Sequence, residues 1–425
     1  MAIEAAGRIL EVKRQLEQGP RPAQAAVLDR LFPNADPALK EKALTLSGCH
    51  LFIRERLLQP HLAFLNQTKS FLITDEARFE SLRPELQVDF QPVLVLESRS
   101  HRARFWTSPE GRVIEFKGLT PQDFDETNIN HNSGQPQGLL EVNPAQSEKA
   151  GLDIVGAVDC GVTELGEYFG DLVQYAQLYR RARDTGDRYF PWLRLDIKPA
   201  AMQVLAELEG VSFETFLQAS CRRFGEQLKT LHRAGRTLHA PFSQPGSRPE
   251  PFFSFLHSGN VEIHGNIIDL EGTRSFAGAE RDFREHLKEG EKRKLVGEKY
   301  LAGIENGEDF EIFCRLADLH RFISGNQYTA VVETSLFGSL YVLGGSPDNF
   351  NLALSGVIRG YYADSGAEAA VEKFIEKDLI PYLTRNHLDY QARKTTLNPY
   401  FPFGITHQVF SYLENDVIPA AGTST

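Results

Sequence analysis

Residues 256–276 read LHSGNVEIHGNIIDLEGTRSF and predict a short β-hairpin. Residues 261–263 and 266–268 are two strand-like runs rich in valine and isoleucine, and Gly265 lies between them. Glycine at such a place is typical of a tight turn, because it adopts backbone conformations that other residues avoid. We therefore expect two short paired strands with polar residues at the open end of the hairpin.

Two registers of this hairpin are open, and both bring a carboxylate to Asn260. If His264 and Gly265 are the two turn residues, Asn260 lies opposite Asp269, with Cβ atoms about 5 Å apart. If the turn begins at Gly265 instead, Asn260 faces Glu271. An amide oxygen beside a carboxylate suits Mg²⁺, which prefers oxygen ligands and retains several waters. Asparagine and aspartate also cap surface hairpins, so this simpler interpretation stays open.

The order of these residues resembles that of protein-kinase-like enzymes. The H-x-G-N run ending at Asn260, the hydrophobic hairpin, and the I-D-L-E-G run containing Asp269 resemble the catalytic-loop asparagine and metal-binding aspartate of that fold. The short gap between the two residues is most similar to that of the selenoprotein O family, whose members transfer AMP from ATP to protein hydroxyls. The resemblance implies that Asn260 and Asp269 bind Mg²⁺ on the phosphates of ATP.

The predicted elements follow the order of a two-lobed protein-kinase-like fold of class α+β. Residues 1–66 predict an N-terminal helical extension, residues 67–165 a small antiparallel-sheet lobe with a short helix, and residues 166–425 a large helical lobe that carries the hairpin. Before the hairpin, the strands are expected at residues 71–73, 92–96, 103–106, 113–117 and 154–158. The main helices are expected at residues 37–58, 144–152, 172–183, 213–234, 283–287, 310–322 and 367–383.

Composition limits the classes of function. The 425 residues, 41% hydrophobic and 24% charged, predict a globular protein with more than one core. A net charge of −11 argues against a general nucleic-acid-binding surface. The four cysteines form no C-x-x-C pair, which argues against a zinc site or a disulfide framework. Without a signal peptide or a run of about 18 apolar residues, we expect a cytoplasmic protein that binds no membrane.

The resemblance places the ATP-binding residues in the small lobe. Lys117 ends a predicted strand in a K-G run and, by similarity, contacts the α- and β-phosphates of ATP. Glu141 and Glu148 are the candidates for the carboxylate that holds this lysine. Glu141 has the more family-like separation from Lys117, and Glu148 lies within a predicted helix. Arg102 lies where kinases have a glycine-rich loop, so its side chain is a candidate phosphate contact.

The catalytic base departs from the kinase pattern. Gly259 stands where the selenoprotein O family has an aspartate, and no aspartate occurs in residues 240–260. His257 and Glu271 are therefore the candidates for accepting the proton of the acceptor hydroxyl. Glu271 is also a candidate second metal ligand.

Two further histidines have expected structural roles. His239 stands where the loop histidine of related proteins anchors the catalytic loop, and His232 is expected to pack at the end of a helix.

These observations favour an Mg²⁺- and ATP-dependent transferase that moves an adenylyl group to a protein, peptide or small-molecule acceptor. A phosphotransferase fits the same residues, because residue types do not report which phosphorus meets the acceptor. Gly259 and the missing glycine-rich loop favour a nucleotide-binding pseudokinase scaffold instead. A metal-dependent hydrolase using His257, His264 and Asp269 is disfavoured, since His264 lies at the predicted turn.

Overall fold

The chain forms two compact units in the computed structural model, Met1–Leu193 and Arg194–Thr425. The described residues are 25, 28–29, 32–48, 51–52, 94–98, 103–107, 113–117, 150–151, 158–164, 179–184, 195, 199–242, 250–254, 258–268, 270, 273–286, 310–324, 340, 346–385 and 409–422. The predicted lobe boundaries at residues 66 and 165 and the predicted strand at residues 71–73 lie outside this set.

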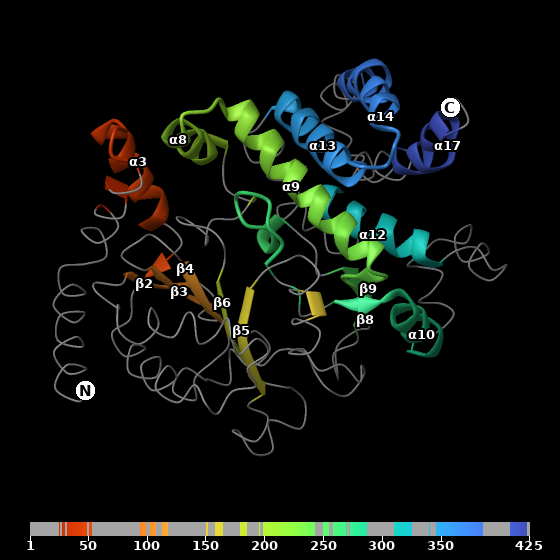
Figure 1. Ribbon diagram of the computed structural model, residues 1–425, viewed down its shortest axis with the longest axis horizontal. Helices are drawn as coiled ribbons and strands as arrows, with labels where there is room; N and C mark the ends of the chain where they lie inside the picture. The colour runs from red at the N-terminus through yellow and green to blue at the C-terminus, as the bar shows by residue number, and fades with distance from the viewer. Residues whose placement is uncertain are drawn as a thin grey trace, which may run out of the picture. The chain divides into compact units, whose positions relative to one another are not determined.

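The first unit contains a six-stranded antiparallel sheet (Figure 1). Its strands are β1 (Leu51–Phe52), β2 (Leu94–Ser98), β3 (Ala103–Thr107), β4 (Val113–Lys117), β5 (Val158–Glu164) and β6 (Tyr179–Asp184), in the spatial order β1-β2-β3-β4-β6-β5. Strands β2, β3 and β4 confirm three of the predicted strands. Together with the helices of the second unit, the sheet confirms the α+β class.

One prediction for this unit was wrong in part. The helix predicted at residues 172–183 was wrong from Tyr179 onward, where β6 forms, and its earlier residues lie outside the described set. Of the strand predicted at residues 154–158, only Val158 is described, and it is the first residue of β5. Strand β6 lies between β4 and β5 and pairs with both of them through its backbone. These two partner strands are distant in the sequence and are not visible in local spacing.

Helix α3 (Pro37–Gly48) begins where the sequence predicts it. The Oδ1 atom of Asp36 accepts a hydrogen bond of 2.7 Å from the N–H of Ala38, and Pro37 is the first helical residue. An aspartate cap followed by proline is a frequent helix start. The predicted end near residue 58 was wrong, because Leu51 and Phe52 already pair as β1 with β2.

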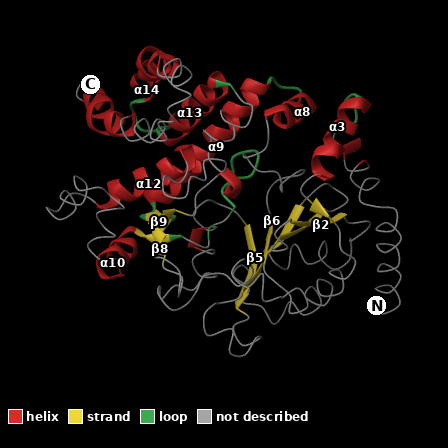
Figure 2. Ribbon diagram, turned by 180° about the vertical axis from the view of Figure 1, so that it is seen from behind, coloured by secondary structure: helices red, strands yellow, loops and turns green. Residues whose placement is uncertain are grey.

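The second unit is mostly helical (Figure 2). Its described helices are α8 (Pro199–Glu209), α9 (Phe213–Arg233), α10 (Phe276–His286), α12 (Phe310–Ser324), α13 (Pro347–Tyr361), α14 (Glu368–Phe374) with its π-helical continuation η8 (Ile375–Leu379), and η9 (Leu413–Val417) with α17 (Ile418–Gly422). Two small antiparallel pairs join β7 (Arg236–Thr237) to β10 (Arg274–Ser275) and β8 (His239–Phe242) to β9 (Glu250–Ser254). No described helix is long and apolar enough to cross a membrane.

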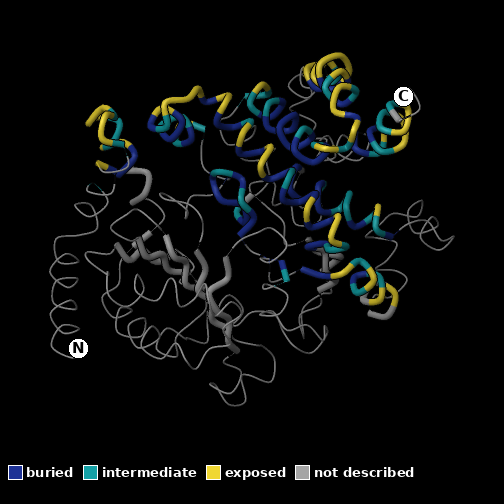
Figure 3. The backbone as a smooth tube through the Cα atoms, viewed as in Figure 1, coloured by how far each residue is buried: buried dark blue, intermediate teal, exposed yellow. Residues whose placement is uncertain are grey.

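Helix α9 is central to the core of this unit and confirms the helix predicted at residues 213–234. The hydroxyl of Ser212 caps its first turn by accepting a hydrogen bond of 3.1 Å from the N–H of Thr215. Its buried apolar side chains recur every three or four residues, and exposed residues lie between them (Figure 3). They are Phe213, Phe216, Leu217, Cys221, Phe224, Leu228 and Leu231.

Helix α13 runs along α9, and glycines let the two backbones approach closely (Figure 1). A Cβ atom on Gly360 would lie 2.0 Å from the carbonyl oxygen of Arg222, and one on Gly225 would lie 2.4 Å from that of Val357. Both distances are far below van der Waals contact, so the two helices stay this close only while both positions are glycine.

We expect Gly360→Ala to lower the free energy of unfolding by about 1–3 kcal/mol, because the added methyl overpacks the contact between α9 and α13. Alanine otherwise favours a helix by about 1 kcal/mol over glycine. Gly278→Ala in α10 is the matched control, since its Cβ would meet only the hydroxyl of Ser275, at 3.0 Å. Urea denaturation of both variants measures the difference. Equal stability of the two variants would contradict the close-packing argument.

Candidate functional site

The predicted hairpin turn is present, but an isolated β-bridge takes the place of the two predicted strands, and its register differs from both predictions. Val261 pairs with Ile267, and the N–H of Ile268 donates a hydrogen bond of 3.0 Å to the carbonyl oxygen of Asn260. Asn260 is therefore opposite Ile268, and the predicted registers that placed it opposite Asp269 or Glu271 were both wrong.

The turn explains the shift in register. The N–H of Gly265 donates a hydrogen bond of 2.8 Å to the carbonyl oxygen of Glu262, and the N–H of Glu262 donates one of 2.9 Å to that of Asn266. Residues 263–265 thus form a three-residue connection that ends on Gly265 at φ +93°. A β-turn that is followed by a glycine with positive φ is a common three-residue hairpin connection. It uses one residue more than the two-residue turns that we expected.

Asn260 is the predicted metal ligand that the structure describes. It is the last residue of the short 3-10 turn η6 (Ser258–Asn260) and is buried, with 9% of its surface exposed. His257, Asp269 and Glu271 lie outside the described residues, so their roles stay predictions. Within the described ranges, no group of three or more histidine, cysteine, aspartate or glutamate side chains is arranged to hold a metal ion.

The predicted ATP-binding residues belong to the first unit. Lys117 is the last residue of β4, as predicted, and is in register with Ala103 and Arg181. Arg102, Glu141 and Glu148 lie outside the described residues. Their contacts with ATP stay predictions.

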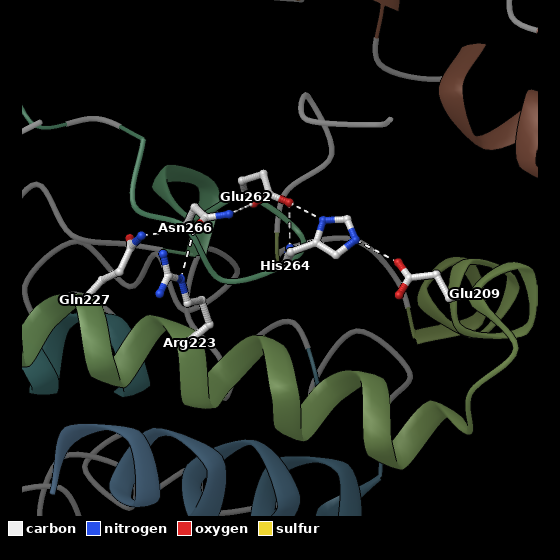
Figure 4. A network of polar contacts seen from close by, with 6 residues as sticks. All are labelled: Glu209, Arg223, Gln227, Glu262, His264 and Asn266. Carbon is white, nitrogen blue, oxygen red and sulfur yellow. Dashed lines mark hydrogen bonds and ion pairs between the residues drawn. The ribbon is translucent and has the colours of Figure 1, made fainter. Parts of the chain in front are cut away.

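The hairpin carries a buried carboxylate that the sequence did not single out as functional. Glu262 has no exposed surface. Its Oε1 atom accepts hydrogen bonds from the backbone N–H of His264 at 2.7 Å and from Nδ1 of the same residue at 2.5 Å. Its Oε2 atom accepts one from Nδ2 of Asn266 at 2.7 Å (Figure 4). Every one of these partners is a donor, so the ionised carboxylate is satisfied in place.

The electrostatics of Glu262 follow from these partners. Burial alone raises the pKa of the carboxyl group, because it disfavours the charged form. The charge of His264 and the hydrogen bonds from His264 and Asn266 outweigh burial and hold the pKa of Glu262 below its usual value. The buried group therefore stays a carboxylate.

Side chains of α9 hold the hairpin from one side. The Oδ1 atom of Asn266 accepts hydrogen bonds from Nε2 of Gln227 at 3.0 Å and from Nε of Arg223 at 3.3 Å. The N–H of Ile267 donates a hydrogen bond of 2.7 Å to Oε1 of Gln227. Gln227 thus supplies the acceptor that a neighbouring strand would offer to the N–H of Ile267. The hairpin is fixed in this way to α9, the longest helix among the described residues (Figure 4).

A second buried network supports the segment that follows α9. Asp318 of α12 has no exposed surface, and its Oδ2 atom accepts hydrogen bonds from Thr237 Oγ1 at 2.7 Å and from the N–H of Leu238 at 3.0 Å. The same oxygen is 3.1 Å from Nε2 of His232, at the end of α9. Nδ1 of His232 is 2.6 Å from the hydroxyl of Tyr361 on α13.

These contacts assign the protons of the second network. A carboxylate accepts only, so Nε2 of His232 donates to Asp318 and, in neutral imidazole, Nδ1 accepts from Tyr361. Burial raises the pKa of Tyr361 well above its usual value, which keeps this hydroxyl a donor. His232 packs at the helix end, as predicted, and it also joins α9 to α12 and α13. His239, the predicted loop anchor, is the first residue of β8, directly after the bonded Leu238.

Sequence reasoning missed Asp318, although one signal pointed to it. Phe310, Cys314 and Phe322 of α12 are buried at a spacing of four residues, and Asp318 falls in the same row. A charged residue within an apolar helical row is rarely buried without partners. That position therefore predicts a buried carboxylate, but not which groups bind it.

The described part of the site is compatible with Mg²⁺ on a nucleotide. Such an ion takes one or two protein oxygen ligands and fills its other positions with phosphate oxygens and waters. Asn260 lies at the open end of a hairpin that α9 and the buried carboxylate of Glu262 hold in place. No known family model, curated protein or solved structure matches the chain.

Proposed function

We propose that the protein is an Mg²⁺- and ATP-dependent transferase of kinase-like fold, which moves an adenylyl group to a protein, peptide or small-molecule acceptor. The main support is the order of the residues in the sequence, with Asn260 directly before the hairpin and Asp269 directly after it. In the structure Asn260 is paired with Ile268, and Asp269 follows this pair outside the described residues. An amide and a carboxylate near the open end of one hairpin are the oxygen ligands that an Mg²⁺-nucleotide requires.

The surrounding structure adds a second line of support. Transferases that act on ATP accelerate the reaction chiefly by positioning and electrostatics, so their ligands need rigid support. The hairpin bonds to α9 through Gln227 and Arg223, and the segment after α9 bonds to Asp318. Gln227 and Asp318 are buried, Arg223 is exposed, and all three belong to the second unit.

Binding of Mg-ATP is the first test. A ligand at about 100 times its Kd stabilises the folded state by about 2.7 kcal/mol, which raises the Tm. We expect this rise with Mg-ATP, a smaller one with ATP and EDTA, and neither in Asn260→Ala or Asp269→Ala. The exposed residues Asn415 and Asp378 supply the controls, Asn415→Ala and Asp378→Ala, which should respond like the wild type.

The products of ATP distinguish the two transfer reactions. Adenylyl transfer joins the α-phosphorus to the acceptor hydroxyl, breaks the bond between the α- and β-phosphates, and releases pyrophosphate. Phosphoryl transfer joins the γ-phosphorus to the acceptor and releases ADP. We expect pyrophosphate in the wild type and loss of the reaction in Asn260→Ala. Release of ADP without pyrophosphate would contradict adenylyl transfer and identify the reaction as phosphoryl transfer.

A nucleotide-binding scaffold is the second candidate, and Gly259 favours it. This residue stands at the position where the selenoprotein O family has its loop aspartate. A rise in Tm with Mg-ATP, without pyrophosphate or ADP, would favour the scaffold. No rise in Tm would contradict both candidates.

A further inference from the structure

His264 lies between two carboxylates at the turn of the hairpin. Its Nδ1 atom is 2.5 Å from Oε1 of Glu262, and its Nε2 atom is 2.8 Å from Oε1 of Glu209 (Figure 4). Ionised carboxylates accept hydrogen bonds and do not donate them. Both ring nitrogens must therefore carry a proton, and His264 is an imidazolium in this arrangement.

The two carboxylates belong to different parts of the unit. Glu262 is the buried residue at the start of the turn, and Glu209 is the last residue of α8. The carboxyl end of a helix carries partial negative charge, to which the carboxylate of Glu209 adds. A cation is favourable at this place, and the imidazolium of His264 supplies it. The ring thus ties the end of α8 to the hairpin.

The neighbouring contacts from α9 leave this assignment unchanged. The ring of Phe216 on α9 meets it edge to face, with ring centroids 5.6 Å apart. Arg223, also on α9, donates to Asn266, which in turn donates to Glu262. The charged groups that these contacts place around the imidazole are thus Glu209 and Glu262, with Arg223 one hydrogen-bonded residue further away.

We propose that His264, Glu209 and Glu262 are positioning residues, and that the protonated imidazole of His264 holds the hairpin in the register that places Asn260. None of the three needs to touch the nucleotide. The contact between α8 and the hairpin does not depend on the proposed function. Only its effect on the binding of Mg-ATP rests on that function.

The tie depends on pH in one direction. An unperturbed imidazole titrates near pH 6.5, and two neighbouring carboxylates favour its charged form. The tie is complete while the imidazole is protonated and is lost as the pH rises and the proton leaves. Pairing within the hairpin should therefore weaken from mildly acidic to mildly alkaline pH.

Amide hydrogen exchange tests the tie directly. The N–H groups of Gly265 and Ile268 are bonded within the hairpin, and that of Ile268 reports the pairing with Asn260. After correction for the intrinsic effect of pH, we expect their protection in the wild type to fall about three- to tenfold between about pH 6 and about pH 8. In His264→Gln, which cannot titrate, protection should be low at both values and independent of pH.

Two variants of α8 complete the experiment. Glu209→Gln removes one carboxylate of the tie and should lower protection at about pH 6. Glu207→Gln is the matched control, because Glu207 is exposed on the same helix and accepts a hydrogen bond from Gln203. It should keep the protection and pH dependence of the wild type. Protection that is equal in the wild type, Glu209→Gln and His264→Gln would overturn the proposal.

Mg-ATP binding, measured on the same proteins, separates this proposal from the function. Loss of protection together with weaker Mg-ATP binding in His264→Gln supports both. If His264→Gln loses protection but the wild type binds no Mg-ATP, the proposed function is wrong and the tie is still established. Loss of protection with Mg-ATP affinity unchanged overturns the positioning role.

Discussion

Asp318→Ala is expected to lower the free energy of unfolding by about 3–5 kcal/mol, the cost of removing one partner from a buried charged network. The carboxylate has no exposed surface and accepts from Thr237, Leu238 and His232. Alanine removes the acceptor and leaves these donors in a site that water does not reach. The midpoint of urea denaturation should fall with an unchanged m-value.

Two comparisons test the explanation for Asp318. Asp378→Ala removes the same group from an exposed position and should change the stability by less than about 0.5 kcal/mol. Asp318→Asn keeps one oxygen acceptor and should fall between the wild type and Asp318→Ala. If Asp318→Ala and Asp378→Ala unfold at the same urea concentration, the network does not stabilise the fold.

Gly265→Ala is expected to cost about 2–5 kcal/mol, from two separate causes. The first is the positive φ of +93°, which costs a residue with a Cβ atom about 1–2 kcal/mol. The second is contact with α9, because the new Cβ would lie 1.9 Å from the carbonyl oxygen of Ser220. Such overpacking costs about 1–3 kcal/mol more. Thermal or urea denaturation measures the sum.

Gly366→Ala separates the two causes. Gly366 has φ +76°, and a Cβ atom there would have nothing within 4 Å. This variant should show the backbone cost alone, about 1–2 kcal/mol. Gly265→Ala should also reduce the rise in Tm with Mg-ATP, since the turn would move away from α9. If the two variants are equally stable, the close contact between turn and helix is not a constraint.

The hairpin shows what the local sequence pattern can predict and what it cannot. The runs at residues 261–263 and 266–268 and the glycine between them predicted a hairpin, and a hairpin is present. The register was wrong, because the turn takes three residues and not two. Two tertiary contacts favour the three-residue turn, namely the close approach of Gly265 to α9 and the hydrogen bond between Ile267 and Gln227. Neither contact is visible in the residues of the turn.

Strand β6 and helix α9 show the same contrast elsewhere. The apolar spacing of α9 predicts its position within one residue, because a helix buries one face of its own periodic pattern. The sequence YRRARD of β6 has no such pattern. It becomes a strand because β4 and β5 pair with it on both sides.

The sequence by itself determined the α+β class, the strands β2 to β4, the helix α9 and the presence of a hairpin after residue 256. Each follows from periodicity or turn chemistry within about 20 residues, where neighbours in sequence are neighbours in space. The tertiary structure alone decided the hairpin register, the tie between His264 and Glu209, and the role of Asp318. The partners of Asp318 lie 80 to 86 residues away, and a buried charge takes whichever donors the fold brings to it.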